Sequence, residues 1–423
     1  MPRSRVRGGV PRPVIRQADS VDVVGYARTP FGKFGGVLRT LTLPELGAYT
    51  LAAALRRSDI DPDDVDEIAV GVNFPGSDRT IARQIQLRAG IPDDRVSYSV
   101  DRACCSSLTA INLASKSIRT GDVQVAVAGG VENLSRVPYF IEAARFGRRL
   151  GDIVLTDQLV VSCPHTGIAR AVQASTEAAS YKIGRKEQDE WACRSQERYA
   201  AALDRRFFEG EIEPVFTTDA EGTTVTLEHD ESPRPETSID ALSRLPTVNG
   251  SETVTAGNAP DLSSGSAMLV LRANGSHNAE SVGRIGAWSA AAGDPQHIAS
   301  MPAVAAQLAL RRAGLTLGDV HVLEINEAFA AVPLVSTVVL ASGDRSETER
   351  LREITNVNGG AVAIGHPTGA TAARLVMTTI SELRLRGGGI GLVCICGGIG
   401  EAEALVVYVD DSQRASSTGQ PNA

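Results

Sequence analysis

The chain has 423 residues, of which 43% are apolar, and this is enough for two or three domains with large buried cores. Its formal net charge is −8, so the protein as a whole has no electrostatic attraction to nucleic acid or to an anionic membrane. No stretch of the sequence approaches the ~18 consecutive apolar residues that a membrane-spanning helix needs.

The two ends of the chain predict disordered segments rather than targeting signals. Residues 1–19 carry five arginines and no acid before Asp19, but no apolar stretch follows, so they do not form a secretory signal. Glycines and prolines within this segment oppose the amphipathic helix of a mitochondrial presequence. We therefore predict a disordered leader over 1–19, a disordered polar tail over 412–423, and a cytoplasmic protein.

The first part of the chain alternates between predicted strands and helices. Buried strands bounded by glycine are predicted over residues 21–27, 67–72 and 123–130. Helices are predicted over 43–59 and 105–121, between those strands. This order is the βαβ pattern of an α/β protein.

A long charged segment over 137–246 interrupts this alternation. It has little strand pattern except in FTTDAEGTTVTLEHDE, residues 216–231. The segment therefore reads as an insertion between two α/β parts of the chain.

The second part of the chain repeats the pattern of the first. Strands are predicted over 282–290, 320–326 and 390–396, and a helix is predicted over 301–314. Pro302 suits the first turn of that helix, because proline lacks only an N–H that would be unpaired there. Two similar halves indicate a duplicated fold.

Two thiols and an imidazole stand in sequence contexts that favour chemistry. Cys104 lies at the predicted start of a helix, where the helix N-terminus or a nearby imidazole would lower the thiol pKa and stabilise a thiolate. His366, in AIGHPTGAT, is the natural partner, and Cys394 lies where an apolar strand runs into a glycine turn. A second thiol can give a proton to a leaving group and take one from a carbon acid. These residue types predict covalent acyl transfer followed by proton transfer at carbon.

Asn326 ends the predicted strand over 320–326, and its amide suits a water or a carbonyl oxygen on which negative charge develops. A capping role at a helix begun by EAFAAV is the alternative. Glu327, the next residue, is expected to orient the site rather than to titrate in it. The glycine turn that includes Gly397 would let a substrate approach the backbone closely.

The six cysteines predict reduced, intracellular thiols, because they are few for this length and lack the spacing of an extracellular disulfide framework. Cys163 and Cys193 read as small apolar fillers. A zinc site built from the paired cysteines near positions 104 and 394 is disfavoured, since the usual CxxC spacing is absent. We therefore predict no metal site.

Several motifs together resemble the thiolases, the acyl-CoA acetyltransferases that cleave 3-ketoacyl-CoA or condense two acyl-CoA molecules. The resemblance extends over about residues 20–410. The motifs are RTPFGKFGG (28–36), GGVENLSRVP (129–138), RFGRRLGD (145–152), KEQDEWACRSQERY (186–199), TVTAGNA (253–259), NEAFA (326–330), GHP (365–367) and CICGGIGEA (394–402).

The resemblance implies a thiolase fold, which is a duplicated five-layer α/β/α/β/α arrangement with an inserted loop domain. By this resemblance, residues 20–136 and 247–275 form the N-terminal thiolase domain, 137–246 the loop domain, and 276–411 the C-terminal thiolase domain. The loop domain would cover the active site and contact coenzyme A.

The resemblance also implies roles for individual residues. Cys104 would be the acylated nucleophile, His366 would activate it, and Cys394 would be the acid and base for the carbon acid. Asn326 would hold a water that forms one oxyanion hole with His366. The backbone N–H groups of Cys104 and Cys396 would form the other.

Three further residues are expected to bind the substrate. By resemblance, Arg234 meets the nucleotide end of coenzyme A, where an arginine suits a phosphate or an adenine face. Phe329 is expected to pack beside the acyl chain, and Gly397 lies in the turn that the substrate approaches.

The function implied is an acyl-CoA C-acyltransferase that works by a ping-pong mechanism through a Cys104 acyl-enzyme. Coenzyme A is the co-substrate, and no permanently bound cofactor is expected. Acyl-CoA and coenzyme A would be the partners, and a homodimer or homotetramer is implied by resemblance alone. Acyl-chain length, a linear or sterol-like substrate, and the degradative or biosynthetic direction stay open.

Four departures from the family pattern keep two alternatives open. Ser107 and Cys396 stand where thiolases usually have glycine, Pro260 replaces a serine that touches pantetheine, and ARAVQAS (169–175) replaces MGxTAE. A side chain at position 396 would tolerate a positive φ poorly. The alternatives are a thiolase-like acyl-CoA-binding protein without turnover and a ketosynthase-like condensing enzyme of a biosynthetic pathway.

Overall fold

The computed structural model of the protein describes residues 20–147, 149–160, 162–218, 222–275 and 279–410. The predicted leader over 1–19 and the predicted tail over 412–423 lie outside these residues, so both stay predictions.

A single mixed sheet runs through the molecule. Its strands are β1 (Val21–Arg28), β3 (Glu67–Gly71), β4 (Val96–Val100), β5 (Val125–Asn133), β10 (Ser263–Ala273), β11 (Gly283–Ala292), β12 (Val322–Ile325), β13 (Gly389–Gly398) and β14 (Glu401–Val409), with the short β2 (Gly32–Lys33) beside β10. They lie in the order β12-β13-β14-β11-β1-β10-β5-β3-β4. Strands such as β1 are buried along their whole length, which explains why their sequences are largely apolar.

The helices are α1 (Leu43–Ser58), α2 (Ile81–Arg88), α3 (Ser106–Thr120), α4 (Arg170–Ser180), α5 (Arg185–Asp204), α6 (Ile239–Ser243), α7 (Met301–Ala313), α8 (Ala331–Leu340), α9 (Arg345–Ile354), α10 (Ala361–Ile364) and α11 (Thr368–Leu385). The strands and helices that the sequence pattern predicted are present, with small shifts at their ends. Pro302 stands in the first turn of α7, as predicted. None of the helices within the described residues is long and apolar enough to cross a bilayer.

The two halves of the sheet repeat one arrangement. In the first half β1, β10 and β5 are antiparallel neighbours, and β3 lies parallel to β5. In the second half β11, β14 and β13 are antiparallel neighbours, and β12 lies parallel to β13. Antiparallel pairing of β1 with β11 joins the halves edge to edge. The repeated pairing is the pattern that a duplicated fold requires.

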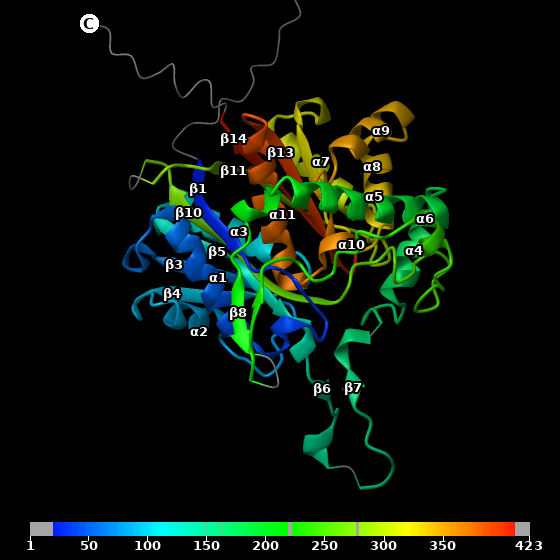
Figure 1. The fold of residues 1–423 in the computed structure, drawn as a ribbon, viewed down its shortest axis with the longest axis horizontal. Coiled ribbons are helices and arrows are strands. Elements are labelled where there is room, and N and C mark those ends of the chain that lie inside the picture. Colours follow the sequence, from blue (N-terminus) through cyan, green and yellow to red (C-terminus); the bar gives the residue numbers. More distant parts are fainter. Residues whose placement is uncertain (1–19, 148, 161, 219–221, 276–278, 411–423) are drawn as a thin grey trace, which may run out of the picture.

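Helices cover and separate these two halves (Figure 1). On one outer side α1 packs against β1 and β10 with α2 beside it, and on the other α7 packs against β11 and β14 with α8 beside it. Between the halves, α3 and α11 pack against each other and against strands of both halves. The layers therefore run helix, sheet, helix, sheet, helix, and the central helix pair brings the two halves into contact.

Part of the segment over 137–246 lies outside the layered arrangement. The short strands β6 (Tyr139–Phe140) and β7 (Thr156–Asp157) form the base of a hairpin that projects from the body (Figure 1). A second hairpin, β8 (Val215–Thr218) with β9 (Thr224–Leu227), forms within the predicted strand region. The remaining helices of the segment, α4, α5 and α6, lie over the second half, where α4 and α5 contact α8.

A buried arginine at the end of β1 ties the sheet to this inserted segment. The Arg28 guanidinium is fully buried and lies 2.7 Å from Asp230 Oδ1 and 3.1 Å from Glu211 Oε2. Tyr199 donates a further hydrogen bond to Asp230 at 3.2 Å. Removing one partner of such a group leaves a buried charge unpaired, so this cluster fixes where the inserted segment sits.

Candidate active site

The ends of the two central helices bring a thiol and an imidazole together. Cys104 lies just before α3, in a turn where Ala103 adopts a positive φ of 49°. His366 lies just before α11. The Cys104 Sγ and the His366 Nε2 are 3.2 Å apart, although 262 positions separate them in the sequence. The contact exists because α3 and α11 pack against each other in the central layer.

Thr371 decides which nitrogen of the imidazole carries the proton. Its hydroxyl donates to the Pro367 carbonyl at 2.9 Å, and it lies 2.7 Å from His366 Nδ1. A hydroxyl has one proton, so its oxygen accepts the Nδ1–H of His366. The unprotonated Nε2 then faces the Cys104 thiol, which is the arrangement of a general base beside its nucleophile. Sequence reasoning missed Thr371, although it stands five residues after the histidine, in the first turn of a helix.

Burial shifts both groups toward their neutral forms, against the predicted stabilisation of a thiolate. Burial lowers the pKa of His366 to about 3, and the positive charge of Arg374 adds to this effect. Burial raises the pKa of Cys104 above its usual value, and the Cys396 thiol adds to the rise while Arg170 opposes it. Desolvation thus outweighs the helix N-terminus at this position. Proton transfer from thiol to imidazole therefore belongs to the attack on substrate rather than to the free protein.

Asn326 lies beside this pair, one residue after the end of β12. Its amide Nδ2 is 3.3 Å from His366 Nε2, and its Oδ1 is buried without a hydrogen-bond partner among the described residues. A buried amide oxygen without a partner is suited to a polar ligand. The alternative of a helix cap is wrong, because α8 begins only at Ala331 and the residue before it is Ala330.

Cys394 lies next to Asn326 through the backbone, but its thiol is directed elsewhere. The Asn326 N–H donates to the Cys394 carbonyl at 3.0 Å, across the parallel pair of β12 and β13. The Cys394 Sγ is fully buried and lies 3.7 Å from the carbonyl oxygen of Glu324. Burial raises the pKa of this thiol, and Glu324 adds to the rise. The structure thus brings Cys104, His366 and Asn326 into one hydrogen-bonded group and places Cys394 beside it.

Cys396 fits its position without backbone strain. It is buried at 3% exposure, and positive φ values begin only after it, at Gly398 (65°) and Ile399 (50°). The expected conflict between a side chain and a positive φ at position 396 is therefore wrong. Burial raises the pKa of the Cys396 thiol to about 11, and this thiol in turn raises the pKa of Cys104.

The glycine turn after this strand packs tightly against the nucleophile segment. A Cβ added at Gly397 would lie 3.1 Å from the Cys105 Sγ, which is tighter than ordinary contact. The Cys105 thiol also lies 3.6 Å from the Ile395 carbonyl oxygen. These contacts hold the end of β13 against the start of α3. Gly397 is buried in this packing, and its predicted role in substrate approach stays a prediction.

Ser107, the second departure from the family glycines, has a structural role. Its hydroxyl accepts a hydrogen bond from the Ala373 N–H at 3.0 Å, so it links α3 directly to α11. The serine therefore reinforces the helix pair that carries Cys104 and His366.

Two buried carboxylates brace the loops around His366. Glu327 is fully buried and accepts hydrogen bonds from Trp191, Ser195, Asn356 and the Val362 N–H, all at 2.8 or 2.9 Å. These bonds position the α10 segment that precedes the histidine, which fits an orienting role. Glu132, which sequence reasoning missed within the GGVEN motif, accepts from the N–H groups of Asn73, Phe74 and Gly369 and from the Thr368 hydroxyl, and so fixes the start of α11.

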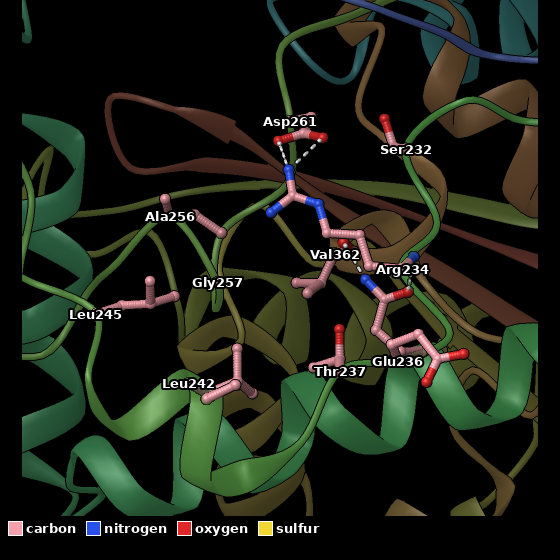
Figure 2. A pocket seen from close by; sticks show the side chains of 13 residues that line it. Ser232, Arg234, Glu236, Thr237, Leu242, Leu245, Ala256, Gly257, Asp261 and Val362 are labelled. Carbon is pink, nitrogen blue, oxygen red and sulfur yellow. Dashed lines mark hydrogen bonds and ion pairs between the residues drawn. The ribbon is translucent and has the colours of Figure 1, made fainter.

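A cavity of about 300 Å³ lies between the inserted segment and the chain around Asp261 (Figure 2). Arg234 and Asp261 stand on its rim, and the Arg234 Nη2 lies 3.1 and 3.2 Å from the two Asp261 carboxylate oxygens. The backbone of Asp261 reaches the site, since its carbonyl accepts the His366 N–H at 3.4 Å. Leu242, Leu245 and Val362 give the cavity an apolar wall (Figure 2).

Phe329 packs against the protein interior, whereas the Arg234 side chain is exposed to solvent. Phe329 is half-buried and packs against the core of the second half, in the segment between Asn326 and α8. The side chain of Arg234 is 58% exposed, so its ion pair with Asp261 is open to exchange with a ligand.

Comparison with known proteins gives one family for the whole described chain. The model for "Thiolase, N-terminal domain" matches residues 21–275, and the model for "Thiolase, C-terminal domain" matches residues 279–409. The probable acetyl-CoA acetyltransferase of Mycobacterium leprae is 36% identical over 398 residues, which cover 92% of this chain and 98% of that protein. The beta-ketoadipyl-CoA thiolase of Pseudomonas aeruginosa is 38% identical over 401 residues, with coverage of 92% and 98%.

Solved structures of thiolases and acetyl-CoA acetyltransferases also match this chain. The human mitochondrial 3-ketoacyl-CoA thiolase in complex with CoA matches with a TM-score of 0.86 at 34% identity, covering 92% of this chain and 98% of that one. The Bacillus anthracis acetyl-CoA acetyltransferase matches with a TM-score of 0.88 at 34% identity, covering 92% and 99%. The predicted thiolase fold is confirmed by these matches. The chain therefore belongs to the thiolase family.

Proposed function

We propose that this protein is an acyl-CoA C-acyltransferase. It would cleave a 3-ketoacyl-CoA with coenzyme A, or run the reverse Claisen condensation. The observation that supports this most is the contact of the Cys104 thiol with His366 Nε2, together with the Thr371 contact that leaves this nitrogen free to accept a proton. Membership of the thiolase family supplies the reaction class.

In the cleavage direction, the Cys104 sulfur attacks the ketone carbon while its proton passes to His366 Nε2. The N–H groups of Cys104 and Cys396 would hold the resulting oxyanion. The carbon–carbon bond then breaks, its electron pair leaves as the enolate of acetyl-CoA, and Cys394 protonates the enolate carbon. Coenzyme A then gives its thiol proton to the Cys394 thiolate and attacks the acyl-enzyme, and the departing Cys104 sulfur takes its proton back from His366.

Asn326 would act on the enolate stage. A water held by its amide, together with His366, would stabilise the thioester oxygen on which negative charge develops. The position of the Asn326 amide 3.3 Å from His366 Nε2 supports this role, since one small molecule can contact both groups.

Coenzyme A would enter through the cavity lined by Arg234. This arginine would exchange its ion pair with Asp261 for the nucleotide end of coenzyme A, because its side chain is exposed. The apolar wall formed by Leu242 and Leu245 suits the less polar part of the ligand. Phe329 and Gly397 would contact the acyl end. Coenzyme A acts here as co-substrate, with no permanently bound cofactor.

We also propose a cytoplasmic homodimer or homotetramer. The projecting hairpin carries exposed apolar side chains, including Phe146 at 90% and Leu150 at 92% exposure, and such side chains favour burial against another copy. The hairpin is therefore the candidate contact surface.

A second candidate is a thiolase-like protein that binds acyl-CoA without turnover. One observation favours it, because the Cys394 thiol bonds the Glu324 carbonyl rather than a group of the nucleophile pair. A ketosynthase-like condensing enzyme would differ in taking its acyl donor from a carrier protein.

The test is thiolysis of acetoacetyl-CoA and of a longer 3-ketoacyl-CoA by the purified protein, with Cys104→Ser as the inactive control. We expect turnover by the wild type and none by the variant. Thioester binding without turnover would favour the binding protein, and turnover only of carrier-protein thioesters would favour the condensing enzyme.

A further inference from the structure

Arg170, the first residue of α4, lies against the glycine turn of the active site. A Cβ added at Gly398 would lie 3.4 Å from the Arg170 Nη2 and 3.5 Å from its Cζ. The guanidinium therefore packs directly over a residue that has no side chain. Gly398 follows Cys396 by two positions at the end of β13, and the Cys396 thiol raises the pKa of Cys104.

The guanidinium has no anionic partner among the described residues. Its hydrogen bond there goes from Nη1 to the neutral amide oxygen of Gln173, at 3.1 Å. Gln173 is itself fixed, because its Nε2 donates to the Pro295 carbonyl at 3.2 Å. Arg170 is half-buried, and a cation removed from water without a counter-ion is unfavourable.

The nearest acid on the same helix is engaged elsewhere. Glu177 accepts hydrogen bonds from the N–H groups of Ile298, Ala299 and Ser300, so its carboxylate serves the start of α7. Arg170 therefore presents an uncompensated positive charge toward the turn at Gly398.

This charge acts at the thioester end of the site rather than at the nucleotide end. The positive charge of Arg170 lowers the pKa of both the Cys104 and the Cys396 thiols, and the larger effect of burial opposes it. Arg170 is not among the residues that line the cavity beside Arg234. The phosphates of coenzyme A lie a whole pantetheine arm away from its sulfur, so they do not reach a group next to the nucleophile.

We propose that Arg170 is a specificity-determining residue that binds a carboxylate on the acyl group held by Cys104. The substrate class would be 3-ketoacyl-CoA thioesters whose acyl chain ends in a carboxylate. This inference rests on the proposed acyltransferase function. The guanidinium Nε and Nη2 make no hydrogen bond among the described residues, so they can donate two parallel hydrogen bonds to a carboxylate. Gln173 holds Nη1 in place.

The segment that carries Arg170 is one of the departures from the family pattern. Arg170 is the second residue of ARAVQAS (169–175), the segment that stands where thiolases usually have MGxTAE. The change thus replaces a segment whose defined charged residue is a glutamate by one whose charged residue is an arginine, which alters what the acyl end of the site can accept.

The experiment compares two thioesters of equal chain length, a 3-ketoacyl-CoA with a terminal carboxylate and its methyl ester. We expect wild-type kcat/KM to favour the carboxylate. In Arg170→Gln, kcat/KM for the carboxylate falls about 10- to 100-fold more than kcat/KM for the ester, the size of a lost charged hydrogen bond. Arg170→Lys retains part of the preference, and Arg311→Gln, a charge removal on the exposed surface of α7, changes neither value.

Two results would overturn the inference. If Arg170→Gln lowered kcat/KM equally for both thioesters, the charge of Arg170 would act on the Cys104 thiol rather than on the substrate carboxylate. A wild-type preference for the ester would exclude a carboxylate site.

The inference stays testable if the wild type turns over neither thioester, a result that counts against the proposed function alone. The affinities of the Cys104→Ser variant for the two thioesters are then compared with and without Arg170→Gln. Tighter binding of the carboxylate that disappears with the arginine supports the inference, and equal affinities contradict it.

Discussion

The Thr371 hydroxyl lies 2.7 Å from His366 Nδ1 and fixes the imidazole in the tautomer whose lone pair faces Cys104. The hydroxyl oxygen accepts a hydrogen bond from Nδ1–H, because the hydroxyl proton is already donated to the Pro367 carbonyl. Orientation of the base therefore comes from one turn of α11, and no acidic residue in the described part of the chain bonds the imidazole.

Removing this hydroxyl should slow catalysis without unfolding the protein. Thr371→Val keeps the shape of the buried side chain but leaves Nδ1–H without its acceptor, so we expect kcat/KM to fall about 3- to 10-fold. Thr371→Ser keeps the acceptor and should retain most of the activity. Steady-state thiolysis checks both variants, and equal rates in Thr371→Val and the wild type would show that the tautomer is fixed by something else.

The neutral resting pair predicts the pH dependence of alkylation. Burial raises the pKa of Cys104 above its ordinary value of 9.0, so the thiolate fraction is small at neutral pH and grows as the pH rises. Inactivation by iodoacetamide should accelerate steadily through pH 9.0. A preformed thiolate–imidazolium pair would instead give a plateau between about pH 5 and pH 8. Cys104→Ser identifies the labelled residue by mass spectrometry.

Loss of the second thiol should separate the two half-reactions. Cys394→Ala should spare acylation of Cys104 from acyl-CoA but lower carbon–carbon bond formation and cleavage at least about 100-fold, because the enolate loses its proton donor. Exchange of label between acyl-CoA and coenzyme A measures the first step, and thiolysis of acetoacetyl-CoA measures the second. Full thiolysis by Cys394→Ala would remove Cys394 from the mechanism.

Restoring the family glycine at position 107 should destabilise this protein. Ser107→Gly removes the hydrogen bond to the Ala373 N–H and adds the conformational freedom of glycine to α3, and together these should lower the free energy of unfolding by about 1 to 2 kcal/mol. Ser107→Ala isolates the hydrogen bond, because alanine favours the helix. Chemical denaturation with urea gives the values, and a more stable Ser107→Gly variant would contradict the role assigned to this side chain.

The fold was largely predictable because its signals are local. The apolar strand over 21–27 and the amphipathic helix over 43–59 are set by periodicity and by caps within a few residues, such as the Thr42 and Glu45 capping box of α1. The motif resemblance then supplied the order of the layers, which no local pattern contains.

The site was predictable in its members but not in its protonation. Sequence motifs pointed to Cys104, His366 and Asn326, which the structure brings together. The raised thiol pKa depends on burial by segments hundreds of positions away, and the direction of the Cys394 thiol depends on its neighbour strand, so neither could be predicted. The charge of Arg170 was visible in the sequence, but only the packing of α4 against Gly398 relates it to the nucleophile.

The duplicated arrangement has one more consequence. The helices α3 and α11 occupy corresponding places in the two halves, each leading into the strand at the same position of its half, β5 or β13. Cys104 precedes one and His366 the other, so the nucleophilic sulfur and its proton acceptor occupy equivalent places in the two halves. Each half, separated from the other, holds only one member of the pair, and reactivity arises at the seam where the two copies meet.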